Sequence, residues 1–374
     1  MTTHPSVHPP VHPPVHPSLV RAASRGITLT EVLVSTAATV VLLSAFIPAA
    51  GMRRGEADAQ AKLALLGQAN ACYAADWNDR QWTALPYDAL STCTLELNRG
   101  CIPQQILGRG PGGSIWGYYL GGAGRCSSEG WPGSCGNYGV YVPIDFAAST
   151  GAMRLPNVVG FREYVARAFY TPEFYAEDDP GYAVAETHFD ATYEFNYDFA
   201  TGAYADASFW FSPAAMLNPQ VLRARANGGF QAYNAVTDPF RAPSVSQCQH
   251  PDLKTRMCEY GWFRGAPEGQ GTSAIGFTAS RSARPVTLFF DGSVQAVDMG
   301  AVQDQDWALF ESSPTDDGLW SRDTPFGKDG WRLGNNGDLI DGRGGGFHFL
   351  TTGGILGRDL LDRGTTNAAQ KGGK

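Results

Sequence analysis

"RGITLTEVLVSTAATVVLLSAFIPAAGMRRGEADAQAKLALLG", residues 25–67, decides the fold. It opens with an apolar run from Ile27 to Ala50 in which Glu31 is the only charged residue. As a helix this run would be roughly 36 Å long, enough to cross a bilayer core of roughly 30 Å. The run therefore predicts a transmembrane helix at 27–50.

The residues after the apolar run keep a helical spacing. Apolar side chains recur every three or four positions, at Leu65, Leu66, Ala69, Cys72, Tyr73 and Trp77. This periodicity predicts an amphipathic helix over 51–82 that continues the transmembrane helix and packs on a soluble domain. Gly67 weakens the helix slightly, and Pro86 sets the limit for its end.

The composition indicates what the rest of the chain is. The formal net charge is −8, which argues against a nucleic-acid partner held by phosphate contacts. Glycine accounts for 45 of 374 residues and aromatic residues for 12%, with few long helical runs, as in a loop-rich β domain. We therefore expect an α+β protein, in which the long N-terminal helix packs on an antiparallel β-rich, loop-rich globular domain at 83–374.

Six of the seven cysteines form pairs that are close in sequence. Because no C-x-x-C motif occurs, zinc and thioredoxin-like sites have little support. Close pairs suit small disulfide-closed loops in an oxidising compartment, while reduced structural cysteines remain the alternative. The expected disulfides are Cys93–Cys101, Cys126–Cys135 and Cys248–Cys258, which leaves Cys72 unpaired.

The start of the apolar run, "RGITLTEVLV", resembles the processing motif of type IV pilins and pseudopilins. In that family a prepilin peptidase cleaves after a glycine, which matches Gly26, and methylates the new N-terminal amine. Glu31 matches the acid five residues into the mature chain. Pro48 matches a proline that kinks the helix in many pilins. Ile27 departs from the usual first residue, phenylalanine.

The resemblance implies a leader at 1–26 that is removed, although the true start of the chain could lie downstream, near Val20. It also implies one pass through the bacterial inner membrane, with the C-terminal domain in the periplasm or outside the cell. The expected partners are the membrane, the prepilin peptidase and other pilin-like subunits of a type IV pilus or a type II secretion filament. The Arg residues on both sides of the apolar run leave its orientation open on charge alone.

Glu31 has a physical role in this interpretation. A carboxylate within hydrocarbon is costly unless it is paired, and cleavage would create a positive amine on Ile27, four residues away on the same helix face. In the family this acid pairs with the amine of a neighbouring subunit. Two alternatives stay open: a signal-anchor with an acid at the headgroup level, and a secretory signal cleaved near "AFIPAAG".

A second motif lies near the C-terminus. The stretches 286–290 and 293–297 flank Asp291-Gly292, which predicts a two-residue β-hairpin at 286–297. This resembles a group of pilin-like proteins of planctomycete type, which carry a histidine, nine residues and Asp-Gly. The histidine position is Arg281 here, so only the Asp-Gly part of the motif matches.

Two further stretches suggest local structure or ligands. Aromatic residues alternate with acids within 161–211, which predicts strands whose exposed face could bind sugar or calcium, solvated sheet being the commoner case. "GNNGDLIDGRGGG" places Asn335, Asn336, Asp338 and Asp341 among glycines, and such oxygen ligands could hold Ca²⁺. A plain cluster of Asx turns is the alternative there.

Catalysis is not expected, since H-E-x-x-H and G-x-S-x-G are both missing from the sequence. Gly108, Gly110 and Gly113 have G-x-G-x-x-G spacing, but Pro111 and the lack of a following helical pattern argue against nucleotide binding. A glycosidase-like acid pair stays open. The leading expectation is a non-catalytic pilin-like or pseudopilin-like subunit. The alternative is a membrane-anchored extracytoplasmic module that binds glycan or protein without polymerising.

Overall fold

The computed structural model describes eleven parts of the chain. They are residues 55–83, 104–113, 115–118, 143–144, 146, 151–179, 181–196, 207–259, 283–312, 318–325 and 347–363. The chain divides into two units, Met1–Ala50 and Gly51–Lys374, and all described residues belong to the second unit. Sequence predictions that concern 1–50, including the transmembrane helix at 27–50, lie outside the described residues.

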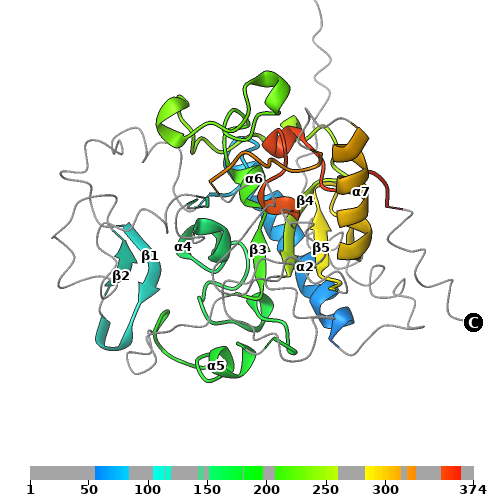
Figure 1. Ribbon diagram of the computed structural model, residues 1–374. Helices are drawn as coiled ribbons and strands as arrows, with labels where there is room; N and C mark the ends of the chain where they lie inside the picture. Colours follow the sequence, from blue (N-terminus) through cyan, green and yellow to red (C-terminus); the bar gives the residue numbers. More distant parts are fainter. Residues whose placement is uncertain are drawn as a thin grey trace, which may run out of the picture. The chain divides into compact units, whose positions relative to one another are not determined.

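A four-stranded antiparallel sheet forms the centre of the described structure (Figure 1). Its strands run in the order β3 (Phe209–Phe211), β4 (Thr255–Glu259), β5 (Val286–Phe289) and β6 (Val294–Ala296). The residues of β3, β4 and β5 are all buried, whereas those of edge strand β6 are half-buried. Because successive side chains point to opposite faces of a strand, continuous burial means that both faces of the sheet are covered.

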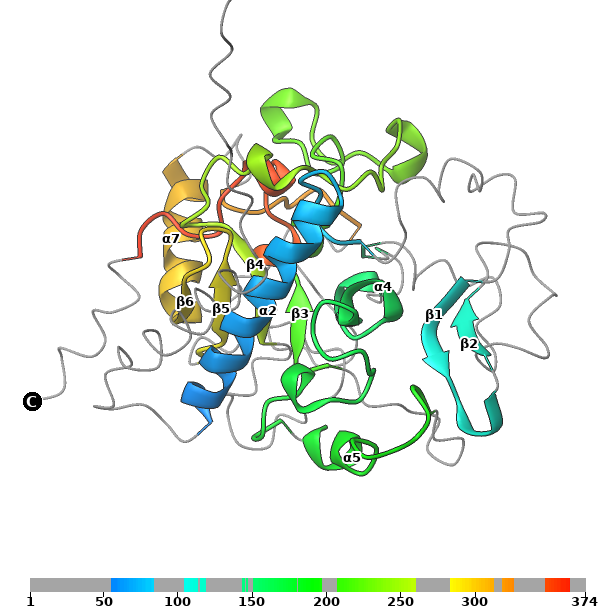
Figure 2. The same ribbon diagram turned by 180° about the vertical axis from the view of Figure 1, so that it is seen from behind.

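Helix α2 (Glu56–Asp76) covers one of these faces, where it contacts β4, β5 and β6 (Figure 2). The side chains that it buries are those of Ala59, Leu63, Leu66, Ala69, Asn70, Tyr73 and Ala74. Five of them, Ala59, Leu63, Leu66, Asn70 and Tyr73, are spaced alternately by four and three residues, as expected for one face of an α-helix, and Ala69 and Ala74 adjoin that row. The described structure is therefore of the α+β class, with a helix packed on an antiparallel sheet.

The predicted apolar stripe of α2 is only half right. Leu66, Ala69 and Tyr73 are buried, but Leu65, Cys72 and Trp77 are exposed. Adjacent residues on a helix are about 100° apart, which places Leu65 beyond the edge of the buried face, although that face is wide enough to include the adjacent pairs Ala69–Asn70 and Tyr73–Ala74. The helix carries apolar residues on two faces, and only contact with the sheet distinguishes them.

Gly67 allows α2 to lie close to β5. A Cβ atom at this position would be 3.1 Å from Cδ1 of Leu288, which is tighter than most real contacts. Beside it, the Asn70 amide donates to the Leu66 carbonyl at 2.8 Å and to the Met257 sulfur at 3.3 Å. The glycine that weakens the helix in isolation therefore permits its packing on the sheet.

Helix α2 ends at Asp76, before the predicted limit of 82. Asn78 and Asp79 follow with φ of 53° and 64°, in the left-handed region that these two residue types tolerate best. The chain then turns so that the Trp82 indole is buried and stacks on Phe211 at a centroid distance of 4.5 Å. Two left-handed residues thus redirect the chain into the core.

The other elements surround this centre. Strands β1 (Gln104–Arg109) and β2 (Ile115–Tyr118) form a separate antiparallel hairpin, and helix α7 (Met299–Ser312) follows β6 and lies beside that edge of the sheet (Figures 1 and 2). The Asp298 carboxylate caps the start of α7 by accepting from the Ala301 N–H at 3.0 Å.

The short α-helices are α4 (Val159–Arg162), α5 (Tyr182–Glu186) and α6 (Pro213–Met216). The 3₁₀ turns are η1 (Pro111–Gly113), η3 (Ala152–Arg154), η4 (Pro172–Phe174), η5 (Arg225–Asn227), η6 (Tyr233–Ala235), η7 (Val245–Gln247), η10 (Phe347–Phe349) and η11 (Gly354–Leu356).

The strands predicted within 161–211 are mostly wrong. Of the described residues in that range, only Phe209–Phe211 forms a strand, and the rest are turns and short helices. Phe169, Phe174 and Phe195 are nevertheless fully buried, and Phe169 packs edge-to-face on Phe195 with centroids 4.9 Å apart. The aromatic residues fill the core from irregular backbone, so their alternation does not report strand geometry.

Gly67→Leu should lower the free energy of unfolding by about 1–3 kcal/mol, because the new side chain meets Leu288 in a close-packed interface. The gain of about 1 kcal/mol in helix propensity offsets this only in part. Ala61→Leu adds a similar group on the exposed side of the same helix and serves as the control. Denaturant unfolding measures both variants, and equal stabilities would contradict the close packing of α2 on β5.

Candidate functional site: a buried polar network between β4 and the C-terminal segment

Most of the candidate functional residues predicted from the sequence lie outside the part of the chain that the structure describes. They are the processing and kink residues Gly26, Ile27, Glu31 and Pro48, the cysteines Cys93, Cys101, Cys126 and Cys135, the calcium candidates Asn336, Asp338 and Asp341, and Arg281. The Asp291-Gly292 pair and the Cys248–Cys258 pair are described.

Strands β5 and β6 form an antiparallel hairpin around Asp291-Gly292, with Leu288 opposite Val294. The loop differs from the predicted two-residue turn. The Phe289 N–H donates to the Ser293 carbonyl, the Gly292 N–H donates to the Phe289 carbonyl, and Gly292 has φ of 84°. Three residues therefore lie between Phe289 and Ser293, with glycine at the left-handed position that such loops require.

The Asp291 carboxylate holds this loop and connects it to the end of the chain. It accepts hydrogen bonds from the Ser293 N–H at 2.9 Å and the Ser293 hydroxyl at 2.6 Å. The Arg363 guanidinium pairs with its other oxygen at 3.0 Å and lies over the Phe289 ring. The Asp-Gly motif thus has a structural role here, as a turn secured by a cation from the C-terminus.

The structure does not form the predicted Cys248–Cys258 disulfide. Cys258 lies in β4, in the main core, with Trp210 and Thr287 as its register partners. Cys248 follows η7 and packs against a separate small cluster containing Phe290 and Ile355. The extended strand carries Cys258 away from Cys248, so a short spacing in sequence does not become a short distance between sulfurs.

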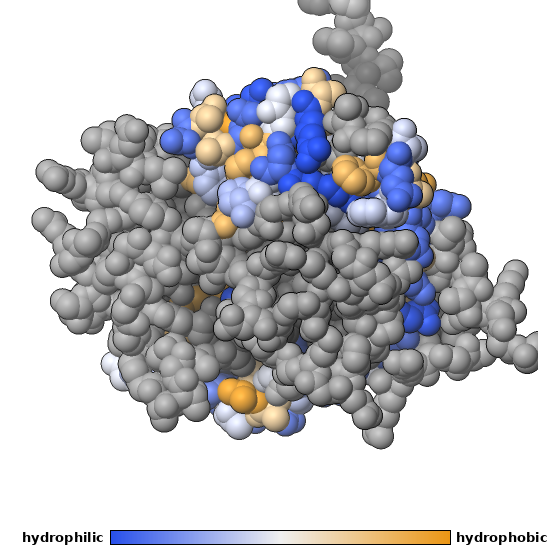
Figure 3. Space-filling model, in the orientation of Figure 1, coloured by the Kyte–Doolittle hydropathy of each residue, from blue (hydrophilic) through white to orange (hydrophobic). Residues whose placement is uncertain are grey.

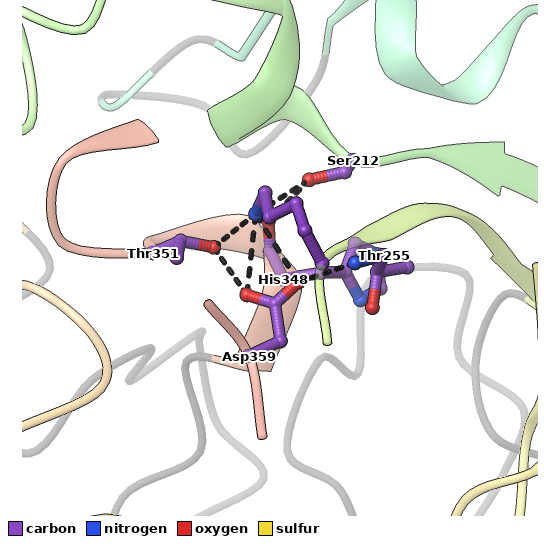
Figure 4. A network of polar contacts seen from close by, with 6 residues as sticks. Ser212, Thr255, His348, Thr351 and Asp359 are labelled. Atoms are coloured by element: carbon purple, nitrogen blue, oxygen red, sulfur yellow. Dashed lines mark hydrogen bonds and ion pairs between the residues drawn. The ribbon is translucent and has the colours of Figure 1, made fainter. Parts of the chain in front are cut away.

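A buried polar network centres on Lys254, immediately before β4 (Figure 4). Its ammonium donates to both Asp359 carboxylate oxygens, at 3.1 and 3.2 Å, and to the Thr351 hydroxyl at 2.6 Å. A longer contact of 3.4 Å reaches the Ser212 hydroxyl. The side chains of Lys254 and Asp359 are 0% and 1% exposed.

Asp359 is held by two further donors. The Thr255 N–H donates to one carboxylate oxygen at 2.8 Å, and the Thr351 hydroxyl donates to the other. The Ser212 hydroxyl donates to the His348 carbonyl at 2.8 Å. The network therefore joins the sheet to residues 347–363, which we call the C-terminal segment.

Burial sets the electrostatics of this pair. Loss of hydration lowers the pKa of the Lys254 ammonium, and the adjacent Asp359 carboxylate opposes that shift. Removal of one partner from such a pair typically costs about 3–5 kcal/mol, because the remaining charge is left buried. The pair therefore makes correct placement of the C-terminal segment a condition for a stable core.

His348 lies in the same region, between two phenylalanines. It is 1% exposed, and its ring centroid is 4.8 Å from that of Phe347 and 4.3 Å from that of Phe349. Neither ring nitrogen has a hydrogen-bond partner among the described residues. Burial, with Lys254 nearby, holds the pKa of His348 well below its usual value, so the imidazole is neutral at neutral pH.

A second buried ion pair connects α7 to the loop that follows it. The Arg322 guanidinium donates to both oxygens of the Asp306 carboxylate, which also accepts from the Leu319 N–H at 2.7 Å. Burial raises the pKa of Asp306, and Arg322 opposes the shift. Gly318 has φ of 75°, and a Cβ there would lie 2.6 Å from Asp306, so the contact requires glycine.

Serine, lysine and histidine are catalytic residue types, but their arrangement here does not favour catalysis. Ser212 and Lys254 are 0% exposed and His348 is 1% exposed, so a substrate could not reach them. The Ser212 hydroxyl donates to a backbone carbonyl and is not directed to a base. In the described structure this network therefore acts as an internal connection of the fold.

The surface of the described residues offers little that marks a ligand site. On the face shown in Figure 3, their hydrophobic residues lie in small separate groups among hydrophilic ones. The described His, Cys, Asp and Glu side chains form no group of three or more that could hold a metal ion. None of the helices in the described ranges combines the length and apolar character needed to cross a membrane.

Comparison with known proteins gives no relative: no family model, no curated protein and no solved structure matches the chain.

The Lys254 network was not predicted from the sequence. Thr351 and Asp359 are 97 and 105 residues from Lys254, and nothing in the local pattern joins them. One sequence feature could have indicated the network: Lys254 directly precedes the stretch TRMCE, which forms the fully buried strand β4. A charged residue at the start of a fully buried strand requires a buried partner.

His348 should make the protein sensitive to acid. Below pH 6.5 the unfolded histidine binds a proton that the folded one does not, so the stability present above pH 6.5 is lost as the pH falls. The expected contribution is up to about 1.4 kcal/mol per pH unit. His348→Leu should show a shallower fall of unfolding free energy between pH 6.5 and 5 than the wild type.

Denaturant unfolding at several pH values measures the effect. His250→Leu is the matched control, because His250 is half-buried and lies outside the network. If His348→Leu retains the slope of the wild type, His348 is not the group that titrates.

Proposed function

We propose that the protein is a non-catalytic pilin-like or pseudopilin-like subunit of a type IV pilus or type II secretion-type filament. The observation that carries this proposal is α2. It begins at Glu56, shortly after the apolar run ends at Ala50, and it packs across an antiparallel sheet. Such a helix suits a chain whose N-terminal part assembles in a membrane while the rest remains a folded domain.

The features of α2 support an anchored domain in two ways. Its buried face is close-packed on the sheet through Gly67, so the helix belongs to the domain and is not a flexible tether. Its exposed side carries Leu65, 40% exposed, together with Cys72 and Ala75. An apolar outer side is compatible with packing against other helices.

The buried networks support a structural role over an enzymatic one. The buried ion pairs Lys254–Asp359 and Arg322–Asp306 are used within the core, where they connect separate segments of the domain. Perturbed groups of this kind mark a functional site when they lie in a cleft, but these lie in close-packed protein. Their role in the proposed subunit is to maintain the domain.

The proposal predicts processing between Gly26 and Ile27. Mass spectrometry of the membrane-extracted protein should find Ile27 as the N-terminal residue, because the peptidase that acts on this motif cleaves after the glycine. An intact leader on the mature protein would contradict the pilin-like assignment. An N-terminus near Gly51 would instead indicate ordinary secretion.

Assembly should depend on Glu31. If its carboxylate pairs with the amine of a neighbouring subunit, Glu31→Ala leaves one charge in a low-dielectric environment, at a cost of about 3–5 kcal/mol. That cost should reduce subunit association by about a hundredfold or more, without affecting expression or cleavage.

Co-purification of tagged and untagged subunits measures the association. Glu31→Gln is the isosteric control, since it retains the shape of the side chain and loses the charge. Equal co-purification of wild type, Glu31→Ala and Glu31→Gln would reject the pairing and would favour an anchored binding module that does not polymerise.

A further inference from the structure

Three properties of the Lys254–Asp359 pair, taken together, are unusual for an ordinary salt bridge. The amine nitrogen lies within 3.2 Å of both carboxylate oxygens, the two side chains are at most 1% exposed, and they come from segments 105 residues apart. Charged reactants of this kind are stable in water because they are hydrated, and that hydration is lost here. From this geometry we propose that Lys254 and Asp359 condense to an intramolecular amide bond.

The surrounding donors are arranged for this reaction. The Lys254 ammonium donates to the Thr351 hydroxyl at 2.6 Å, and that hydroxyl donates to Oδ1 of Asp359. Through these two hydrogen bonds a proton can pass from the amine to the carboxylate, which produces a neutral amine and a neutral acid. Burial lowers the pKa of the Lys254 ammonium, which eases the loss of its proton.

Bond formation follows at Cγ of Asp359. The Nζ lone pair attacks Cγ, and the electron pair of the carbonyl moves to Oδ2, which the Thr255 N–H holds at 2.8 Å. A second proton passes from Nζ through the Thr351 hydroxyl to Oδ1, which leaves as water while Oδ2 becomes the amide oxygen. An ammonium and a carboxylate are thus converted into an amide and one water, with no change of oxidation state.

The rest of the network is consistent with this reaction. The neutral His348 adds no second cation beside the amine, so a deprotonated Lys254 leaves no charge behind among the residues of Figure 4. The backbone holds both reactants, Lys254 immediately before β4 and Asp359 just beyond η11. Two groups held in contact react as if at very high concentration, which is how a fold can supply the rate.

The wild-type full chain, extracted from the membrane, denatured and digested with trypsin, tests the proposal directly. Trypsin cannot cleave after an acylated lysine, so we expect residues 242–256 to remain one peptide, joined to residues 359–363. The joined species should weigh one water less than the sum of its two parts. Full recovery of the linear peptides 242–254 and 359–363 would overturn the proposal.

Two variants test the proton relay. Thr351→Ser keeps the hydroxyl and should form the joined peptide, whereas Thr351→Val keeps the volume without the hydroxyl and should form it at least tenfold more slowly. Circular dichroism verifies that both variants are folded. If Thr351→Val joins as fast as wild type, the relay through Thr351 is wrong. The test does not depend on filament assembly, so the proposed function can fail while the amide bond is present, and the reverse.

Discussion

The contact between α2 and β5 is the constraint on which the rest of the structure depends. The helix can bury its inner side chains only if Gly67 lies against Leu288, and it then covers one face of the two inner strands, β4 and β5, whose residues are fully buried. The strands have only three to five residues each, so their ladders alone would hold the sheet weakly. Packing against the helix supplies the apolar contacts that such short strands cannot supply for one another.

Buried charged pairs complement that packing where the backbone is irregular. Much of the described chain consists of turns and short helices, which make few repeating hydrogen bonds. Lys254 with Asp359, and Arg322 with Asp306, connect such segments to regular elements by contacts that tolerate little displacement. Pairs of this kind add little net stability compared with apolar side chains. A conformation that separates the two partners is nevertheless strongly destabilised, because it leaves a buried charge unpaired. Their contribution is therefore to the uniqueness of the fold.

Features that depend on neighbouring residues could be predicted from the sequence, and features that depend on distant ones could not. The periodicity after the apolar run predicted α2, and Asp291-Gly292 predicted a hairpin between β5 and β6, because both signals are local. The inner side of α2 was assigned only in part, since Leu65 and Leu66 differ in burial solely through the position of the sheet. Cys248 and Cys258 are close in sequence, but an extended strand separates them. The Lys254 network joins residues about a hundred positions apart, and no local pattern carries that information.

The place of the C-terminal segment has a consequence for how the chain is made. Lys254 meets Thr351 and Asp359 only when these residues have been made, 97 and 105 positions after the lysine. A chain that emerges N-terminus first, from a ribosome or from a translocation channel, therefore contains all the described strands before the Lys254 network can form. Until then a buried lysine has no counter-ion, and the incomplete domain can open again easily. Products that stop before residue 351 should accordingly stay open to proteolysis, because Lys254 then lacks both of these partners.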